Sequence, residues 1–236
     1  MSEEELKTKD EAEEWARNNK KKIALEKTSK KIYPPEDNPV SVFMAGSPGA
    51  GKTESSKNLL QKLSKNKNNI IRIDPDELRI FFQKYTGNNS SLFHTAVSIL
   101  AEKIHDIAID NNQSFIFDGT FSKIEKARHN ISRSLNRGRF VQIYYVYQDP
   151  LQAWEFVKAR EKIEGRNIPK SKFIEQYFSS RETVNTLKKE FSKDIGIDLL
   201  VKNIDGTDQY YQANIDNIDS YVVEKYTRES LNDLLQ

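Results

Sequence analysis

The chain has 236 residues, with 37 Lys and Arg against 35 Asp and Glu and a formal net charge of +2. This length suits one α/β domain with a short appendage, and the near balance of charge gives no global basic field of the kind that binds nucleic acid or membranes. The absence of cysteine excludes disulfide bonds, thiolate catalysis and cysteine metal sites.

The N-terminal segment MSEEELKTKDEAEEW is acidic and lacks the apolar stretch of a secretory signal. No apolar run approaches the ~18 residues that cross a bilayer. The basic run at 18–31 follows acidic residues and has no interleaved aromatics, which favours a solvated helical face over a nucleic-acid or lipid patch. We therefore expect a cytoplasmic protein that contacts neither membranes nor nucleic acid.

The first predicted element is a helix over residues 4–31, opened by a capping box at Thr8 and Glu11. The segment YPPEDNP at 33–39 ends it, because each proline restricts the residue before it. These features divide the chain into a helical extension with a proline linker, residues 1–38, and a main domain, residues 39–236.

Strands and helices alternate through the main domain. A helix is predicted from 53 to 63, and another over 90–110 has apolar residues at the 3.6-residue helical period. Alternation of this kind indicates a three-layer α/β fold, in which helices cover both faces of a parallel sheet. Five strands are predicted for that sheet, at 40–46, 69–74, 114–120, 139–147 and 197–204.

The segment GSPGAGKT, directly after the first strand and before a helix, matches the phosphate-binding loop pattern GxxxxGK(S/T). Glycines let backbone N–H groups surround the phosphates, Lys52 reaches the β and γ phosphates, and the Thr53 hydroxyl ligates Mg²⁺. We expect ATP and Mg²⁺ as cofactors. The predicted nucleotide-binding residues are Gly46, Ser47, Pro48, Gly49, Ala50, Gly51, Lys52 and Thr53.

Three uses of such a loop compete. A GTPase switch is expected to carry a guanine-reading NKxD segment after a later strand, and neither YQDP nor NIDG in those places fits. A motor or transporter ATPase usually needs far more chain. Phosphoryl transfer to a small acceptor needs only positioning, charge neutralisation and a base, so a kinase is the leading class.

Acidic residues follow the second and third strands. Asp74 and Asp76 in RIDPDEL lie beyond the second strand, at the edge where parallel α/β sheets bind ligands. One carboxylate is expected to help hold Mg²⁺ and the other to accept the proton of an acceptor hydroxyl; capping of the next helix is the alternative. Asp118 and Thr120 in FDGT are expected to grip a polar acceptor, with a plain turn as the alternative.

Residues 157–173, here called the lid segment, carry six basic side chains against two glutamates. Such a helix-to-loop segment is typical of a lid that closes over a triphosphate and neutralises the transferred phosphoryl group. A solvated basic helix is the alternative. The basic residues are Lys158, Arg160, Lys162, Arg166, Lys170 and Lys172.

Together, GSPGAGKT, IRIDPDEL, a helix with Glu102, FIFDGT and KAREKIEGRNIPK resemble the zeta toxin family over about residues 40 to 175. This family comprises the kinases of epsilon/zeta toxin–antitoxin pairs. The resemblance implies a P-loop kinase-like domain that phosphorylates the 3′-hydroxyl of the amino sugar of UDP-N-acetylglucosamine and so inhibits cell-wall synthesis. It also implies a small helical antitoxin as a partner.

The resemblance assigns roles to individual residues. Lys52 is similar to the family's phosphate-binding lysine and Asp76 to its general base, which leaves Asp74, or Asp118 in its place, to complete the Mg²⁺ shell. The other carry-overs are Arg160 and Arg166 as lid arginines, and Glu102, Asp118 and Thr120 as substrate-binding residues. One alternative function is a nucleoside, antibiotic or polynucleotide kinase. Another is a non-catalytic binding protein whose shape changes when it binds a nucleotide, without phosphoryl transfer.

Overall fold

The fold is built on one six-stranded sheet. A computed structural model describes residues 1–64 and 70–235 of the chain. The strand order is β2-β3-β1-β4-β5-β6, and every neighbouring pair is parallel except β5 and β6. The strands are β1 (Val40–Ala45), β2 (Ile71–Ile73), β3 (Phe115–Phe117), β4 (Phe140–Tyr147), β5 (Ile195–Lys202) and β6 (Asp208–Gln212).

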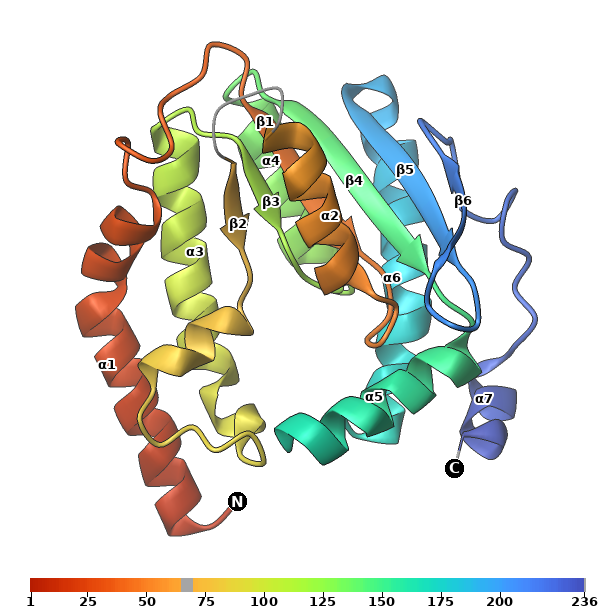
Figure 1. Ribbon diagram of the computed structural model, residues 1–236, viewed down its shortest axis with the longest axis horizontal. Helices are drawn as coiled ribbons and strands as arrows, with labels where there is room; N and C mark the ends of the chain where they lie inside the picture. The colour runs from red at the N-terminus through yellow and green to blue at the C-terminus, as the bar shows by residue number, and fades with distance from the viewer. Residues whose placement is uncertain (65–69, 236) are drawn as a thin grey trace.

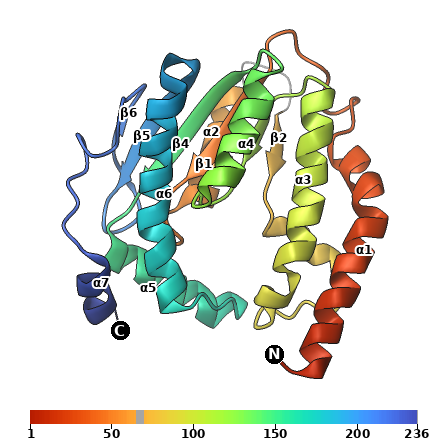
Figure 2. The ribbon, with the colours of Figure 1, turned by 180° about the vertical axis from the view of Figure 1, so that it is seen from behind.

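Helices cover both faces of the sheet, as Figures 1 and 2 show from opposite sides. Helix α2 lies on one face, and α3, α4 and α6 lie on the other. This three-layer arrangement confirms the predicted α/β class. The helices are α1 (Glu3–Lys27), α2 (Lys52–Ser64), α3 (His94–Asp110), α4 (Ile124–Leu135), α5 (Pro150–Glu164), α6 (Lys170–Phe191) and α7 (Arg228–Leu234), with 3₁₀ turns η1 (Glu77–Phe81), η2 (Ser90–Phe93) and η3 (Ser192–Asp194).

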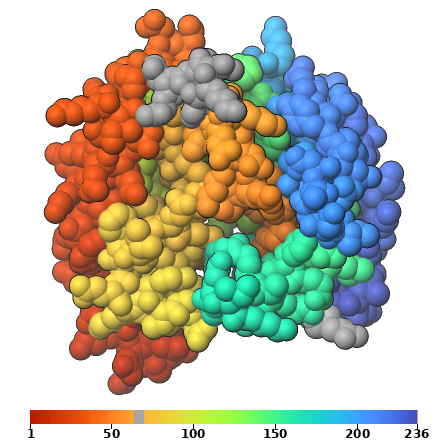
Figure 3. Space-filling view, in the orientation of Figure 1, coloured from red at the N-terminus to blue at the C-terminus, as the bar shows by residue number. Residues whose placement is uncertain are grey.

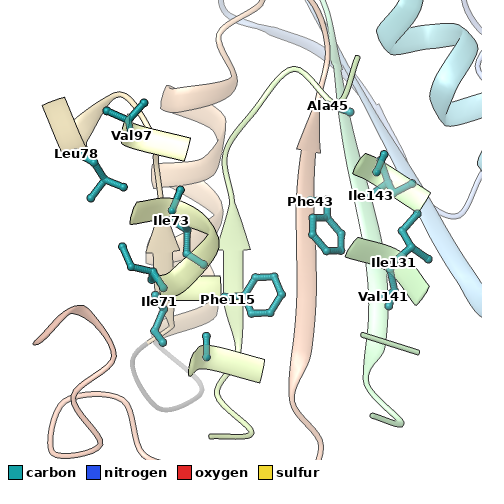
Figure 4. Packing of buried hydrophobic residues seen from close by; sticks show 14 of the residues in the cluster. Phe43, Ala45, Ile71, Ile73, Leu78, Val97, Phe115, Ile131, Val141 and Ile143 are labelled. Carbon is teal, nitrogen blue, oxygen red and sulfur yellow. The ribbon is translucent and has the colours of Figure 1, made fainter. Parts of the chain in front are cut away.

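Alternate side chains of each strand enter opposite cores, because strand side chains point to the two faces in turn. Phe43, Ile71, Ile73 and Phe115 belong to the core shared with α3, α4 and α6, and Figure 4 shows them along neighbouring strands. Their strand neighbours Val42, Met44 and Ile116 pack instead toward Leu59, Leu60 and Leu63 of α2.

Helix α1 packs against α3 and belongs to the main core. Its buried residues are Ala12, Ala16, Ile23 and Ala24. The predicted capping box at Thr8 and Glu11 is wrong: the helix begins earlier, and Ser2 and Glu5 form the box. Both pairs satisfy the same S/T-x-x-E spacing, so the pattern alone does not select between them. The domain boundary at residue 38 stays a prediction.

The strand count also differs from the prediction, which was five. The sixth strand, β6, is exposed along its whole length and therefore lacks the apolar alternation that marks a half-buried strand. Strand β5 begins at Ile195, two residues before its predicted start, and residue 69 of the predicted second strand lies outside the described residues. None of the helices in the described part of the chain has the length and apolar character that crossing a bilayer requires.

One ionisable side chain is enclosed in the main core. His105 on α3 is fully buried, with its ring 4.8 Å from that of Phe115 and 5.3 Å from that of Phe117. Neither ring nitrogen has a hydrogen-bond partner within the described residues. Burial, and secondarily the charges of Arg133 and Arg139, lower the pKa of His105 from 6.5 to about 3.

We predict that His105→Leu raises the free energy of unfolding at neutral pH by about 1–3 kcal/mol, because the substitution removes two unpaired buried polar atoms. The folded pKa lies below the unfolded one, so protonation favours the unfolded chain as the pH falls through 6.5 toward 3. The wild type should lose ~1.4 kcal/mol per pH unit there from this residue, and the variant should not. Urea unfolding at several pH values measures both. His129→Gln, at an exposed position of α4, is the control; a variant less stable than wild type would contradict the account.

Candidate active site

Three loops meet at one edge of the sheet. Because β1, β2 and β3 are parallel, their carboxyl ends lie together. The phosphate loop follows β1, the Asp74–Asp76 segment follows β2, and the Asp118–Thr120 segment follows β3. The lid segment approaches the same edge through the end of α5 (Figure 1). The fold therefore gathers the predicted site residues from four separate stretches of sequence.

The phosphate loop is pressed between β4 and α5. Its three glycines, at 46, 49 and 51, all have positive φ, a conformation that side chains strongly disfavour. At Gly49, with φ of +75°, an added Cβ would also lie 2.1 Å from the carbonyl oxygen of Ala153 in α5. Only glycine fits there, and the contact fixes the loop on the helix that leads to the lid.

Lys52 begins α2 at the end of this loop. Its ammonium donates to the carbonyl oxygen of Ser47 at 2.6 Å, which folds the side chain back over the loop. Loss of solvent lowers the pKa of Lys52 to about 8, while Asp118 and then Asp76 oppose the decrease. A bound triphosphate would supply the negative charge that this ammonium lacks.

Arg72 of β2 connects the two acidic strand ends. Its guanidinium donates to Asp74 Oδ2 at 2.5 Å and to Asp118 Oδ2 at 2.8 Å. It also pairs with Glu77, and its Nε donates to Ser56 Oγ at 3.0 Å. The Arg72 side chain is only 8% exposed, and its contacts with Asp74 and Asp118 are shielded from solvent.

Asp76 lies between two arginines. Arg79, from the turn that follows, pairs with Asp76 Oδ1, and Arg166 from the lid segment pairs with Asp76 Oδ2. The backbone N–H of Asp76 donates to Asp74 Oδ1 at 2.8 Å, which orients the loop. The predicted base and one predicted lid arginine are thus in direct contact.

The two neighbouring aspartates have opposite pKa shifts. Burial raises the pKa of Asp74, and the negative charges of Asp118 and Asp76 raise it further. Burial also acts to raise the pKa of Asp76, but Arg166 and Arg79 more than offset it, so that this pKa is lowered. Asp76 is therefore ionised at neutral pH and able to accept a proton.

The lid segment closes onto the loop that precedes η2. An added Cβ at Gly87 would lie 2.1 Å from the carbonyl oxygen of Glu164, at the end of α5. Gly165 follows in the left-handed conformation and ends the helix, which turns Arg166 toward Asp76. Figure 3 shows the yellow surface of this loop and the green-blue surface of α5 meeting below α2.

The segment after β3 is tied to the phosphate loop. The Gly46 N–H donates to the carbonyl oxygen of Thr120 at 3.2 Å, and Thr120 Oγ1 lies 2.9 Å from Ser122 Oγ. Between them, Phe121 has a φ of +59°, which is strained for a bulky residue. Its ring packs on Phe43 at 5.8 Å, and this packing holds the reversal that places Thr120 beside the loop.

Two predicted residues make other contacts. Glu102, 53% exposed on α3, pairs with Lys126 of α4 at 2.7 Å. Arg160, 44% exposed on α5, pairs with Glu164 at 3.1 Å, although it remains near enough to Lys52 to lower its pKa. The structure therefore brings together Lys52, Asp74, Asp76, Asp118 and Arg166, and holds Glu102 and Arg160 in ion pairs outside that group.

Sequence reasoning missed two arginines of the site. Arg72 alternates with Ile71 and Ile73, a pattern that normally indicates a solvent-facing strand position. Arg79 lies in a 3₁₀ turn and is 6% exposed. Charge balance is the sequence signal that could have identified Arg72 and Arg79, because three aspartates brought to one buried edge of the sheet require cations nearby.

The zeta toxin family model matches residues 23–216, which is most of the chain and includes every segment of the site. The chain belongs to the zeta toxin family. No curated protein sequence matches it.

Solved structures resemble this zeta toxin family member in fold. A chain from the PezAT chromosomal toxin–antitoxin system of Streptococcus pneumoniae has a TM-score of 0.61 at 15% identity, covering 92% of this chain and 87% of that one. The AvrRxo1-ORF1:AvrRxo1-ORF2 complex with sulphate ions has a TM-score of 0.60 at 15% identity, covering 91% and 70%. The same complex with ATP has a TM-score of 0.58 at 17% identity, covering 88% of this chain and 65% of that one. At these identities the likeness shows the kinase-like fold.

We predict that Arg166→Ala raises the pKa of Asp76 toward its usual range, because the lid guanidinium is the larger of the two positive influences on that carboxylate. A ¹³C NMR titration of the aspartate carboxyl carbons, assigned with Asp76→Asn, measures the shift. Arg160→Ala is the matched control, since it removes an arginine of the same segment that pairs with Glu164 instead. An unchanged Asp76 titration in Arg166→Ala would show that the lid does not engage this residue in solution.

Proposed function

We propose that the protein is an ATP- and Mg²⁺-dependent kinase that transfers the γ-phosphate to the 3′-hydroxyl of the amino sugar of UDP-N-acetylglucosamine or a related nucleotide sugar, and thereby inhibits cell-wall synthesis. Membership of the zeta toxin family supports the kinase class. The observation that carries the proposal is the contact of Asp76 with Arg166, which joins the base candidate to the lid within the field of Lys52.

The proposed transfer uses these residues in defined roles. The acceptor oxygen bonds to the γ-phosphorus, the bond from this phosphorus to the β,γ-bridging oxygen breaks, ADP leaves, and the hydroxyl proton passes to Asp76. Lys52 and Arg166 stabilise charge on the transferred group. Arg166 must leave Asp76 to reach the phosphoryl oxygens, and this exchange frees the carboxylate for the proton.

When bound, Mg²⁺ would neutralise charge on the phosphates. The described residues contain no cluster of three or more His, Cys, Asp or Glu that could hold a metal ion. In nucleotide sites Mg²⁺ commonly takes only one or two protein carboxylates beside phosphates and waters. Thr53 and a strand-end carboxylate are the proposed ligands. Both carboxylate oxygens of Asp74 accept hydrogen bonds within the protein, whereas Asp118 accepts only through Oδ2. These contacts favour Asp118 as the carboxylate ligand of Mg²⁺.

The acceptor is expected to bind between the β3–α4 loop and α3. Thr120 lies beside the phosphate loop with its hydroxyl 2.9 Å from Ser122 Oγ, and Glu102 of α3 pairs with Lys126 of α4. For Glu102 to contact a sugar, its exposed pair with Lys126 must open, which costs little because exposed ion pairs are weak. The choice of UDP-N-acetylglucosamine rests on the resemblance of these residues to the family.

An antitoxin partner is part of the proposal. Two similar folds come from a toxin–antitoxin system and from a two-protein complex. A partner that inhibits transfer is expected to cover the phosphate loop or the acceptor side, which both belong to the carboxyl edge of the sheet. The cytoplasm, where nucleotide sugars and ATP are available, is the proposed compartment.

Incubation with ATP, Mg²⁺ and a panel of nucleotide sugars, nucleosides and single-stranded DNA tests the function. We predict a mass gain of one phosphate on UDP-N-acetylglucosamine or a related nucleotide sugar, detected by mass spectrometry. Phosphorylation of a nucleoside or a DNA end instead would show that the acceptor belongs to that class and is not a nucleotide sugar. Tight ATP binding with no phosphorylated product from any acceptor would favour a nucleotide-gated binding protein and contradict a kinase.

We predict that Asp76→Asn lowers kcat by about 10²–10⁴-fold, the usual contribution of a positioned acid or base, while the Kd for ATP stays close to the wild-type value. Steady-state kinetics and calorimetry measure the two quantities. Asp110→Asn, which alters an exposed aspartate paired with Arg137, is the control. Full activity of Asp76→Asn would refute the assignment of the base.

A further inference from the structure

A buried arginine in a short strand is costly unless its charge has a use. Arg72 projects from the middle of β2 toward α2, where its Nε reaches Ser56 Oγ at 3.0 Å. Its strand neighbours Ile71 and Ile73 enter the opposite core. Removing a guanidinium from water costs several kcal/mol, and here two aspartates compensate it.

The two aspartates are held differently. Asp74 accepts from Arg72 through Oδ2 and from the Asp76 N–H through Oδ1, so both its oxygens are engaged. Asp118 accepts from Arg72 at 2.8 Å and from Ser56 Oγ at 3.0 Å through the same oxygen, Oδ2. Among the described residues, the side-chain hydrogen bonds of Asp118 all go to Oδ2, which leaves Oδ1 available to a ligand.

The sheet order gives Asp118 the better position. It follows β3, the strand next to β1, whereas Asp74 follows the edge strand β2. Ser56, its second donor, stands one turn after Thr53, and its single hydroxyl proton is shared between Asp118 Oδ2 and the Thr53 carbonyl oxygen, which lies 2.9 Å away. Asp118 is the strongest negative influence on Lys52. Asp118 therefore lies within electrostatic reach of the lysine of the phosphate loop.

We propose that Arg72 is a positioning residue that fixes Asp118 with one oxygen toward the phosphate-loop side while engaging Asp74 within the protein. Arg72 acts only through Asp118 and does not touch the nucleotide. Its effect is exerted on Mg²⁺–nucleotide binding, because a carboxylate with a fixed orientation binds a metal–phosphate group with less loss of side-chain freedom. The kinetic consequence rests on the proposed function, but the binding consequence does not.

Calorimetry with a non-hydrolysable ATP analogue, with Mg²⁺ and with EDTA, tests the proposal on the full chain. We expect Arg72→Met to reduce the Mg²⁺-dependent gain in affinity about tenfold or more, as losses of second-sphere partners do. Affinity in EDTA should change little. Arg72→Lys keeps the charge but lacks the planar fork that binds two carboxylates, so it should fold and show an intermediate loss.

Arg181→Met is the matched control. Arg181 is also 8% exposed at its side chain and pairs with the carboxylates of Asp219 and Glu224, but it lies on α6. Both Met variants should lower the unfolding midpoint, and only Arg72→Met should lower the Mg²⁺-dependent affinity. A purely structural role predicts that the folded fraction of each variant binds as the wild type does.

A double-mutant cycle identifies the route of the effect. If Arg72 acts through Asp118, Arg72→Met combined with Asp118→Asn should lose little more affinity than Asp118→Asn alone. Additive losses, or wild-type Mg²⁺-dependent affinity in both Arg72→Lys and Arg72→Met, would overturn the proposal. Absence of phosphoryl transfer by the wild type would remove the proposed function and leave this binding test intact.

Discussion

The pairing of buried carboxylates with arginines is the interaction on which the rest of the site depends. A parallel sheet brings the ends of β2 and β3 to one edge, and with them Asp74, Asp76 and Asp118. Carboxylates that are shielded from water repel one another and regain a proton unless cations lie close. Arg72 balances the two strand ends, while Arg79 and Arg166 balance Asp76.

One of these pairs connects the lid segment to Asp76. Arg166 is the only one of these three arginines that comes from a segment remote in sequence, and its partner is the proposed base. While this pair holds, Asp76 is stabilised as an anion and the lid segment lies across the site. In the proposed mechanism, a triphosphate would offer Arg166 a partner of higher charge, and nucleotide binding would release Asp76 in the same step. Gly49 of the phosphate loop packs closely on Ala153 of α5, and Gly87 packs closely on Glu164 at the end of the same helix. Both contacts hold α5, which leads into the lid segment.

The fold follows from local patterns where those patterns are strong. The apolar runs of β1 and β4, the phosphate loop between strand and helix, and the 3.6-residue stripe of α3 each specify one structure. Strand β6 was missed because an exposed edge strand needs no apolar alternation. The capping box of α1 was misplaced because two neighbouring sequences satisfy the same spacing.

The loops that form the site could be predicted from the sequence, but the ion pairs between their side chains could not. Lys52, Asp74, Asp76 and Asp118 come from motifs that follow strands, so their positions follow from the sheet, and Arg166 comes from the basic lid segment, just after α5 ends. Arg72 and Arg79 have no motif, and their roles depend on burial and on partners distant in sequence. The same limit applies to Glu102 and Arg160, whose side chains select nearby ion partners, Lys126 and Glu164, that no spacing rule identifies in advance.

The most direct test of the account is the fate of the γ-phosphate. With γ-labelled ATP, Mg²⁺ and UDP-N-acetylglucosamine, the label and the ADP formed are measured in the same reaction. The account predicts one labelled phosphate on the sugar hydroxyl for each ADP released. Label that appears only as inorganic phosphate, or ATP that remains intact, would contradict it.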